Sequence, residues 1–298
     1  MMRRPVLVVL AMVFAVAAGI ALGAGPLSTA RSPEPASPAA EEPAAPPAPS
    51  DPRAAYADAL AAAVSSRLYD GDELAGRSVA VVRMPGVPDD QLAALAGQIG
   101  LTGATLVSQY TVRAELLDPA RKSLVDTLGS QLAEQLSETT VPADATAYDR
   151  VGALLGGVVA TGERKGAAPA TDAATIEQSL SSAGLLDVVQ AASLRAPIVL
   201  VYLGEDAGEP ADQALQGLVA GLVGTARSVV VVGSAAAAAD GGQLARFRAD
   251  DLAPAVTTVD GVDGSAGQVT AALATARSFT DVGGDFGAAG ADGPVPMG

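Results

Sequence analysis

The sequence SVVVV at Ser228–Val232 consists of a serine and four consecutive valines, which favour an extended strand. A strand that is apolar on both faces is typical of the centre of a parallel sheet, because helices cover such a sheet on each side. Residues 198–203 predict another strand, stronger than that at residues 187–190, and the i, i+3, i+7 apolar stripe that starts at Leu215 predicts a helix between it and Ser228–Val232. This part of the chain therefore predicts parallel strands joined by a crossover helix.

The same alternation occurs before and after this unit. Ser78–Arg83 is a β-branched run, a helix is expected from Pro88, and residues 104–108 form a second short strand, so the three segments predict a βαβ unit. Residues 256–259 predict a further strand, followed by a helix through Val269. Strands that alternate with helices predict an α/β fold with an open, mostly parallel sheet flanked by helices.

The segment between the two halves is less regular. A helix capped by Asp118 with Pro119 in its first turn, and a second helix around residues 151–159, resemble an insertion between the halves of the sheet. The run DVVQ at residues 187–190 predicts a weak strand.

The amino terminus determines the compartment. Residues 5–25 carry no charge, and as a helix they would be about 31 Å long, enough to cross the hydrocarbon core of a bilayer. Arg3 and Arg4 precede this run, so the positive-inside rule directs the rest of the chain to the outside. A cleaved secretory signal is the alternative, since the small residues around Ala30 could be read by a signal peptidase.

The sequence thus divides into four parts. Residues 1–25 form a membrane anchor or signal sequence, and residues 26–52, with nine prolines and seven alanines, form a Pro/Ala-rich linker. Residues 53–283 are expected to form the exported α/β domain. Residues 284–298, rich in glycine and proline, are expected to form an irregular tail.

Composition restricts the chemistry of the exported domain. The net charge of −15 disfavours nucleic acid as a partner and favours cations or basic partners. The chain has no cysteine, hence no disulfide, and no histidine, the commonest transition-metal ligand and general base. A Ser–His or Cys–His nucleophile is therefore excluded within this chain.

Active-site motifs are also missing: the sequence has no nucleophile elbow, phosphate-binding loop or dinucleotide-binding fingerprint. Ligands of an open parallel sheet bind at the carboxyl ends of the strands, where Met84, Glu205 and Asp206 would converge with Gly233 and Ser234. A thioether beside two carboxylates suggests a cation or ligand site. The alternative is that the acidic residues only solvate loops and cap the next helix. A hydrolase with paired carboxylates would require a raised pKa on Glu205 or Asp206.

Several motifs together resemble a known family. The segments are GIALGAG at residues 19–25, GRSVAVVR at 76–83 followed by two aspartates, TVDGVD at 258–263, and GQV at 267–269. In this order and spacing they resemble the mycobacterial copper transport protein B family of actinobacterial envelope proteins. The resemblance implies a pore-forming protein of the mycobacterial outer membrane that keeps intracellular copper low.

The chain departs from that family in two places. Family members usually carry a coiled coil after the anchor, whereas this chain has the Pro/Ala-rich linker, which leaves homo-oligomerisation open. The Gly-His-Tyr-Gly run of the family tail corresponds here to GDFG at residues 284–287. Soft Cu(I) prefers thiolate, thioether or imidazole ligands, and only five methionines remain. We therefore expect no metal site of high affinity and no cofactor.

These observations lead to one expectation and one alternative. The resemblance implies a copper transport or efflux protein of the cell envelope that is anchored to a membrane by its amino-terminal helix. We expect that it is not an enzyme and that its partner is a cation or a copper-linked molecule. The alternative is an anchored extracytoplasmic binding or scaffold domain that does not bind copper directly.

Overall fold

A computed structural model describes residues 57, 58, 61, 65, 69, 74–135, 141–204, 206 and 208–296 of the chain. The chain divides into two units, Met1–Ala48 and Pro49–Gly298, and all described residues belong to the second. The expected anchor (1–25) and linker (26–52) lie outside the described residues.

The described part is built on one seven-stranded sheet with the order β3-β2-β1-β4-β5-β6-β7. Every neighbouring pair is parallel except β2 and β3, which are antiparallel. The predicted α/β fold with a mostly parallel sheet is confirmed. The strands are β1 (Ser78–Arg83), β2 (Thr105–Val112), β3 (Leu186–Gln190), β4 (Ile198–Tyr202), β5 (Ser228–Val232), β6 (Thr257–Val259) and β7 (Asp285–Phe286).

The strand predicted to be central, β5, lies inside the sheet between β4 and β6. All residues of β4 and β5 are buried, and the two strands pair in parallel from Ile198 opposite Ser228 to Tyr202 opposite Val232. The order has a switch point at β1, because β2 follows β1 on one side whereas β4 pairs with β1 on the other.

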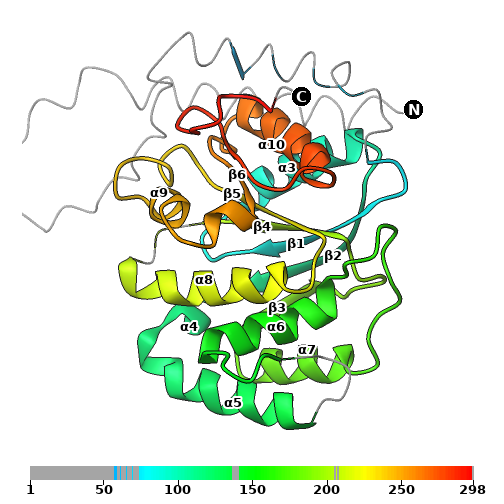
Figure 1. The fold of residues 1–298 in the computed structure, drawn as a ribbon, viewed down its shortest axis with the longest axis vertical. Helices are drawn as coiled ribbons and strands as arrows, with labels where there is room; N and C mark the ends of the chain where they lie inside the picture. Colours follow the sequence, from blue (N-terminus) through cyan, green and yellow to red (C-terminus); the bar gives the residue numbers. More distant parts are fainter. Residues whose placement is uncertain are drawn as a thin grey trace, which may run out of the picture. The chain divides into compact units, whose positions relative to one another are not determined.

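Helices cover both faces of the sheet (Figure 1). On one face lie α3 (Asp89–Leu101) and α10 (Ser265–Ser278). The other face carries α4 (Ala114–Leu117), η1 (Pro119–Arg121), α5 (Lys122–Gln135), α6 (Ala147–Val159), α7 (Ala173–Ser182) and α8 (Glu209–Val223). Two short helices, α9 (Gln243–Arg248) and η2 (Ala253–Ala255), lie between β5 and β6 in the chain.

Alternation along the strands separates the core into two clusters. On β1, Ala80 and Val82 face the cluster under α6 and α8, whereas Val79 and Val81 face the cluster under α3 and α10. The period of two residues therefore fills both faces of the sheet from one strand.

Helices α5 and α6 follow β2 in the chain, where the sequence predicted an insertion between the halves of the sheet, but α6 is an integral part of the core. All of its residues except Asp149 and Arg150 are buried, and it packs lengthwise against α8. Helix α5 lies against α6, and α7 packs against α6 and β3. The α6–α8 pair is thus the tightest helix contact on this face of the sheet.

The expected irregular tail contains an element that the sequence does not indicate. Asp285 and Phe286 form β7, which extends the sheet in parallel beyond β6. The residues that follow have no further strand or helix within the described range, which ends at residue 296.

Candidate functional site

A cavity of about 310 Å³ lies at the carboxyl ends of β1, β4 and β5, beside the switch point of the sheet. This is the position at which open parallel sheets bind ligands. Its lining comes from the β1–α3 loop, α3, the end of β4 and the loop after β5: Gly86, Val87, Pro88, Gln91, Tyr202, Leu203, Gly204, Asp206, Ser234, Ala236 and Ala237.

Gly204, one of the lining residues, lies close to the backbone of the β1–α3 loop. A Cβ atom on Gly204 would lie 1.8 Å from the carbonyl oxygen of Pro85, so only glycine fits at this position. The β1–α3 loop is held by Arg83, which pairs with Asp89 and donates to the carbonyl of Val87. The β1–α3 loop is therefore held by the close approach of Gly204 and by the side chain of Arg83.

Asp206, a predicted site residue, lines the cavity but is committed to a structural ion pair. Arg246 of α9 donates to both of its carboxylate oxygens, at 2.9 and 3.1 Å, and the backbone N–H of Gly208 donates to Oδ1 at 2.8 Å. The Arg246 guanidinium lowers the pKa of the Asp206 carboxyl. A hydrolase acid at this position would need the opposite shift.

Arg246 also holds the start of α8. It donates to Asp212 at 2.6 and 3.0 Å, and this double pairing raises the pKa of the guanidinium. The hydrogen bond from Gly208, the residue before α8, to Asp206 matches the alternative reading in which the acidic residues serve the loop and the next helix.

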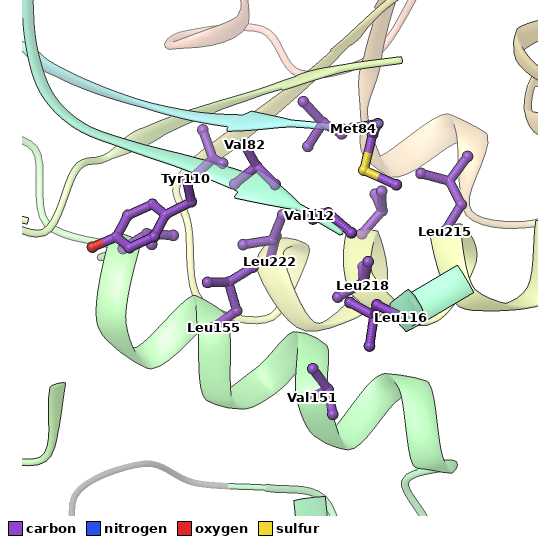
Figure 2. Close-up of a cluster of buried hydrophobic side chains, with 14 of the residues drawn as sticks. Val82, Met84, Tyr110, Val112, Leu116, Val151, Leu155, Leu215, Leu218 and Leu222 are labelled. Carbon is purple, nitrogen blue, oxygen red and sulfur yellow. The ribbon is translucent and has the colours of Figure 1, made fainter. Parts of the chain in front are cut away.

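The other two predicted site residues do not join Asp206 in the cavity. Met84 is 2% exposed and is not among the residues that line the cavity. Figure 2 shows its side chain in the apolar cluster with Leu116 and Leu215. Glu205 lies outside the described residues. The structure therefore brings together Asp206 and Ser234, but not the thioether of Met84.

Two polar residues of the cavity were not singled out from the sequence. The Tyr202 hydroxyl donates to Gln91 Oε1 at 3.1 Å, although the tyrosine is only 1% exposed. Burial, and then the nearby carboxylates of Asp263 and Asp90, raise the pKa of Tyr202 to about 12. The sequence could have indicated Tyr202 by its position at the end of a strand, where the hydroxyl group of a tyrosine can face a crevice.

The TVDGVD motif forms a second polar cluster at the β6 and β7 edge. Asp260 is 1% exposed, and its carboxylate accepts from Arg248 Nη1 at 3.0 Å and from the backbone N–H groups of Ala288 and Ala289 at 2.8 and 3.1 Å. Arg248 also donates to the carbonyl of Phe286 at 2.8 Å. Asp260 and Arg248 together fasten the carboxyl-terminal segment to the sheet.

Asp263 of the same motif contacts the loop after β5 instead of the carboxyl-terminal segment. Its carboxylate accepts from the backbone N–H of Ala235 at 2.8 Å, which fixes the loop after β5 beside the cavity. Gly267 approaches the chain so closely that a Cβ atom would lie 2.0 Å from the carbonyl oxygen of Gly261. Asp260, Asp263 and Gly267, which belong to the motifs behind the family resemblance, thus make contacts that hold neighbouring segments of the chain in place.

Within the described residues, no group of three or more His, Cys, Asp or Glu side chains is placed to hold a metal ion. None of the helices in the described part of the chain is both long and apolar enough to cross a membrane.

Comparison with known protein families identifies the family of the chain. The model of a family described as "Copper transport outer membrane protein, MctB" matches residues 1–296, almost the whole chain. No curated protein matches the chain.

Proposed function

Because the chain belongs to the MctB family of copper transport outer membrane proteins, we propose that it serves copper efflux at the cell envelope and so keeps intracellular copper low. The observation that carries this proposal is the extent of the family match, which spans residues 1–296 and includes both the amino-terminal run and the α/β domain.

We further propose that the chain serves copper transport without a resident copper site of its own. Cu(I) prefers thiolate, imidazole and thioether ligands, and the sequence has neither cysteine nor histidine. Met84 lies in the hydrophobic core, 2% exposed. The excess of acidic residues, with a net charge of −15, would instead attract cations weakly and over a wide surface.

A second function is an anchored extracytoplasmic binding domain, and the cavity at the switch point favours it. Its volume of about 310 Å³ lies at the small end of the range for ligand pockets. The Tyr202–Gln91 pair and Ser234 are its polar groups apart from the committed Asp206, and its other walls are apolar or glycine. Such a cavity fits a small, largely apolar organic molecule better than a metal ion.

The test is a deletion strain grown in a series of copper concentrations, with total cellular copper and zinc measured by elemental analysis. We expect copper, and not zinc, to accumulate in the deletion strain and to return to normal with the wild-type chain. Unchanged copper would contradict the transport function. Equal rises of both metals would indicate a general envelope defect and would favour the binding or scaffold function.

Two complementing variants separate the two functions. Ser234→Val makes the cavity more apolar, and Met84→Leu removes the only thioether of the described residues while preserving the volume of the core. If copper transport needs neither group, both variants restore normal copper. Failure of Ser234→Val alone, with normal protein levels, would assign the function to the cavity.

A further inference from the structure

A cluster of basic residues lies at the amino ends of the central strands, away from the cavity at their carboxyl ends. Arg77 directly precedes β1, Arg227 directly precedes β5, and Arg195 lies shortly before β4. These three strands are neighbours in the sheet and run parallel. The three arginines therefore come together at one end of the strands, although they are far apart in the sequence.

The loop after α6 brings two further basic residues to this end, Arg164 and Lys165, which are both exposed. Two backbone hydrogen bonds fasten the loop beside the start of β4: the N–H of Ala167 donates to the carbonyl of Arg195 at 3.0 Å, and the N–H of Arg195 donates to the carbonyl of Ala167 at 2.8 Å. Arg77 Nη1 donates to the carbonyl of Arg164 at 2.7 Å. We call this set the amino-end cluster: Arg77, Arg164, Lys165, Arg195 and Arg227.

Carboxylates do not neutralise this cluster. Among the described residues, none of its members forms a salt bridge, and Glu163 is the only acidic residue in the adjoining loop, 160–168. The arginines that do pair with a carboxylate are Arg83, Arg113, Arg150, Arg246, Arg248 and Arg277. Acidic residues outnumber basic ones by 33 to 18 in this chain. A group of cations without acidic partners is therefore a specific feature of this surface.

The arginines of the cluster are oriented by uncharged groups. Arg227 Nε donates to the carbonyl of Phe279 at 3.1 Å, and Arg195 Nε donates to the carbonyl of Ala168 at 2.9 Å. The guanidinium carbons of Arg77 and Arg227 lie 4.4 and 4.9 Å from the centroid of the Phe279 ring. A carbonyl or an aromatic ring orients a guanidinium but leaves its charge in place, and a guanidinium has five N–H donors. Most of these donors therefore remain for a ligand.

The size of the cluster favours a compact anion. Neighbouring strands are about 4.8 Å apart, so the starts of β1, β4 and β5 extend over only about 10 Å. A long polyanion or a wide anionic membrane would also meet the surrounding surface of a chain whose net charge is −15, and that surface would repel it. A terminal phosphate group is compact, carries about 1.5 to 2 negative charges at neutral pH and offers three acceptor oxygens to guanidinium donors.

We propose that the amino-end cluster binds the terminal phosphate group of a small molecule or of a lipid headgroup. Arg77 and Arg227, oriented at the Phe279 ring, supply fixed donors, and the exposed Arg164 and Lys165 contact the anion from the loop. This site lies at the other end of the strands from the switch-point cavity, and it does not depend on the copper function proposed above.

The test is a calorimetric titration of the full-length protein, in an uncharged detergent and at constant ionic strength, with pyrophosphate as the probe. Replacing both loop residues, Arg164→Gln with Lys165→Gln, should weaken binding at least about tenfold, because two charge-assisted contacts are lost. Arg77 is held by the backbone carbonyl of Arg164 and not by its side chain, so this contact of the fold is preserved. An unchanged melting temperature checks that the variant is folded.

The sequence offers a matched control for the loss of charge. Arg121 and Lys122 form a second Arg-Lys pair, are also exposed, and follow β2 beyond its carboxyl end. Arg121→Gln with Lys122→Gln changes the net charge by the same amount. Because distant surface charges are screened by salt, this variant should bind pyrophosphate within about twofold of the wild type.

A second titration distinguishes the two sources of the phosphate group and uses phosphatidic acid in the same detergent micelles. Pyrophosphate binding that depends on residues 164 and 165 supports the site and shows that a free phosphate compound suffices. The same dependence with phosphatidic acid alone supports the site and assigns it to a lipid headgroup.

The proposal is overturned if neither probe binds to the wild type, including the case in which only a long polyanion such as heparin binds. It is also overturned if the two pairs of substitutions weaken binding equally, because a diffuse attraction to the charge of the whole chain would give that result.

Discussion

Gly152 of α6 and Gly221 of α8 lie so close that a Cβ atom added to Gly221 would be 2.0 Å from the carbonyl carbon of Gly152. Gly217 and Gly156 repeat this approach one turn away, where an added Cβ would lie 2.5 Å from Tyr148 Cβ and 2.7 Å from Thr225 Oγ1. Both helices therefore carry glycines four residues apart that allow close contact of their backbones, as in tightly packed membrane helices.

Gly221→Ala should destabilise the protein strongly, because the methyl group would force the two helices apart. Overpacking of this kind costs about 1–3 kcal/mol, and more where backbone must move. Chemical denaturation followed by circular dichroism measures the loss. Gly97→Ala in α3 is the control: nothing lies within 4 Å of its added Cβ, so replacing a helical glycine there should stabilise by up to about 1 kcal/mol. Equal effects of the two substitutions would contradict the close packing.

Asp260→Asn should release the carboxyl-terminal segment. Arg248 and Asp260 are 10% and 1% exposed in their side chains, and removing one partner of a buried ion pair typically costs about 3–5 kcal/mol. We expect a lower melting temperature and faster proteolysis beyond residue 284. Asp281→Asn breaks the exposed pair with Arg277 and should cost less than about 1 kcal/mol. A tail that stays protected in Asp260→Asn would show that other contacts hold it.

Asp206 should make stability depend on pH in the acid range. Its pKa is lowered in the folded protein by Arg246, so its contribution is present above the ordinary value of 3.8 and is lost as the pH falls through the lower folded value. Melting temperatures of the wild type and Asp206→Asn, measured from neutral pH downward, should differ at pH 6 and should begin to converge only as the pH falls below the ordinary value of 3.8. The exposed Asp240→Asn serves as a control. A difference that grows on acidification would reverse the sign and refute the ion pair.

The sequence was sufficient for the central strands of the sheet but not for its last strand, β7, or for the contacts between distant residues. The valines of β5 and the stripe of α8 predicted central strands and a crossover helix, because burial and periodicity are local properties. The ion pair between Asp206 and Arg246 joins residues 40 positions apart, and nothing in the sequence indicates it. For the same reason the TVDGVD motif supported a family resemblance but did not reveal that Asp260 holds the chain end.

Met84 shows how the site was only partly predictable. Its position after β1 suggested a place at the crevice, but residues at a strand end alternate between faces, and the structure turns its side chain into the core. Asp206 lines the cavity at the end of β4, whereas Tyr202 and Gln91 were missed because their hydrogen bond depends on how α3 packs over β4.

The last prediction concerns copper itself: the protein should bind Cu(I) no better than an unrelated acidic protein. A high-affinity site requires two or more soft ligands, and the sequence offers no cysteine, no histidine and five methionines. Met84 could reach an ion only if the core opened, since it is 2% exposed among Leu116, Leu215 and their neighbours. Opening the core would expose that apolar cluster to water, at a cost that a single thioether bond would not offset.

Competition between the full-length protein and a colorimetric Cu(I) chelator measures this affinity. We expect the chelator to retain all of the copper, and Met84→Leu, which preserves the volume of the core, to behave as the wild type does. Withdrawal of copper from the chelator by the wild type but not by Met84→Leu would prove the prediction wrong and place the ion at β1. Withdrawal by both would instead direct attention to the methionines outside the described residues, and transport by this family member would then have to include a direct copper-binding step.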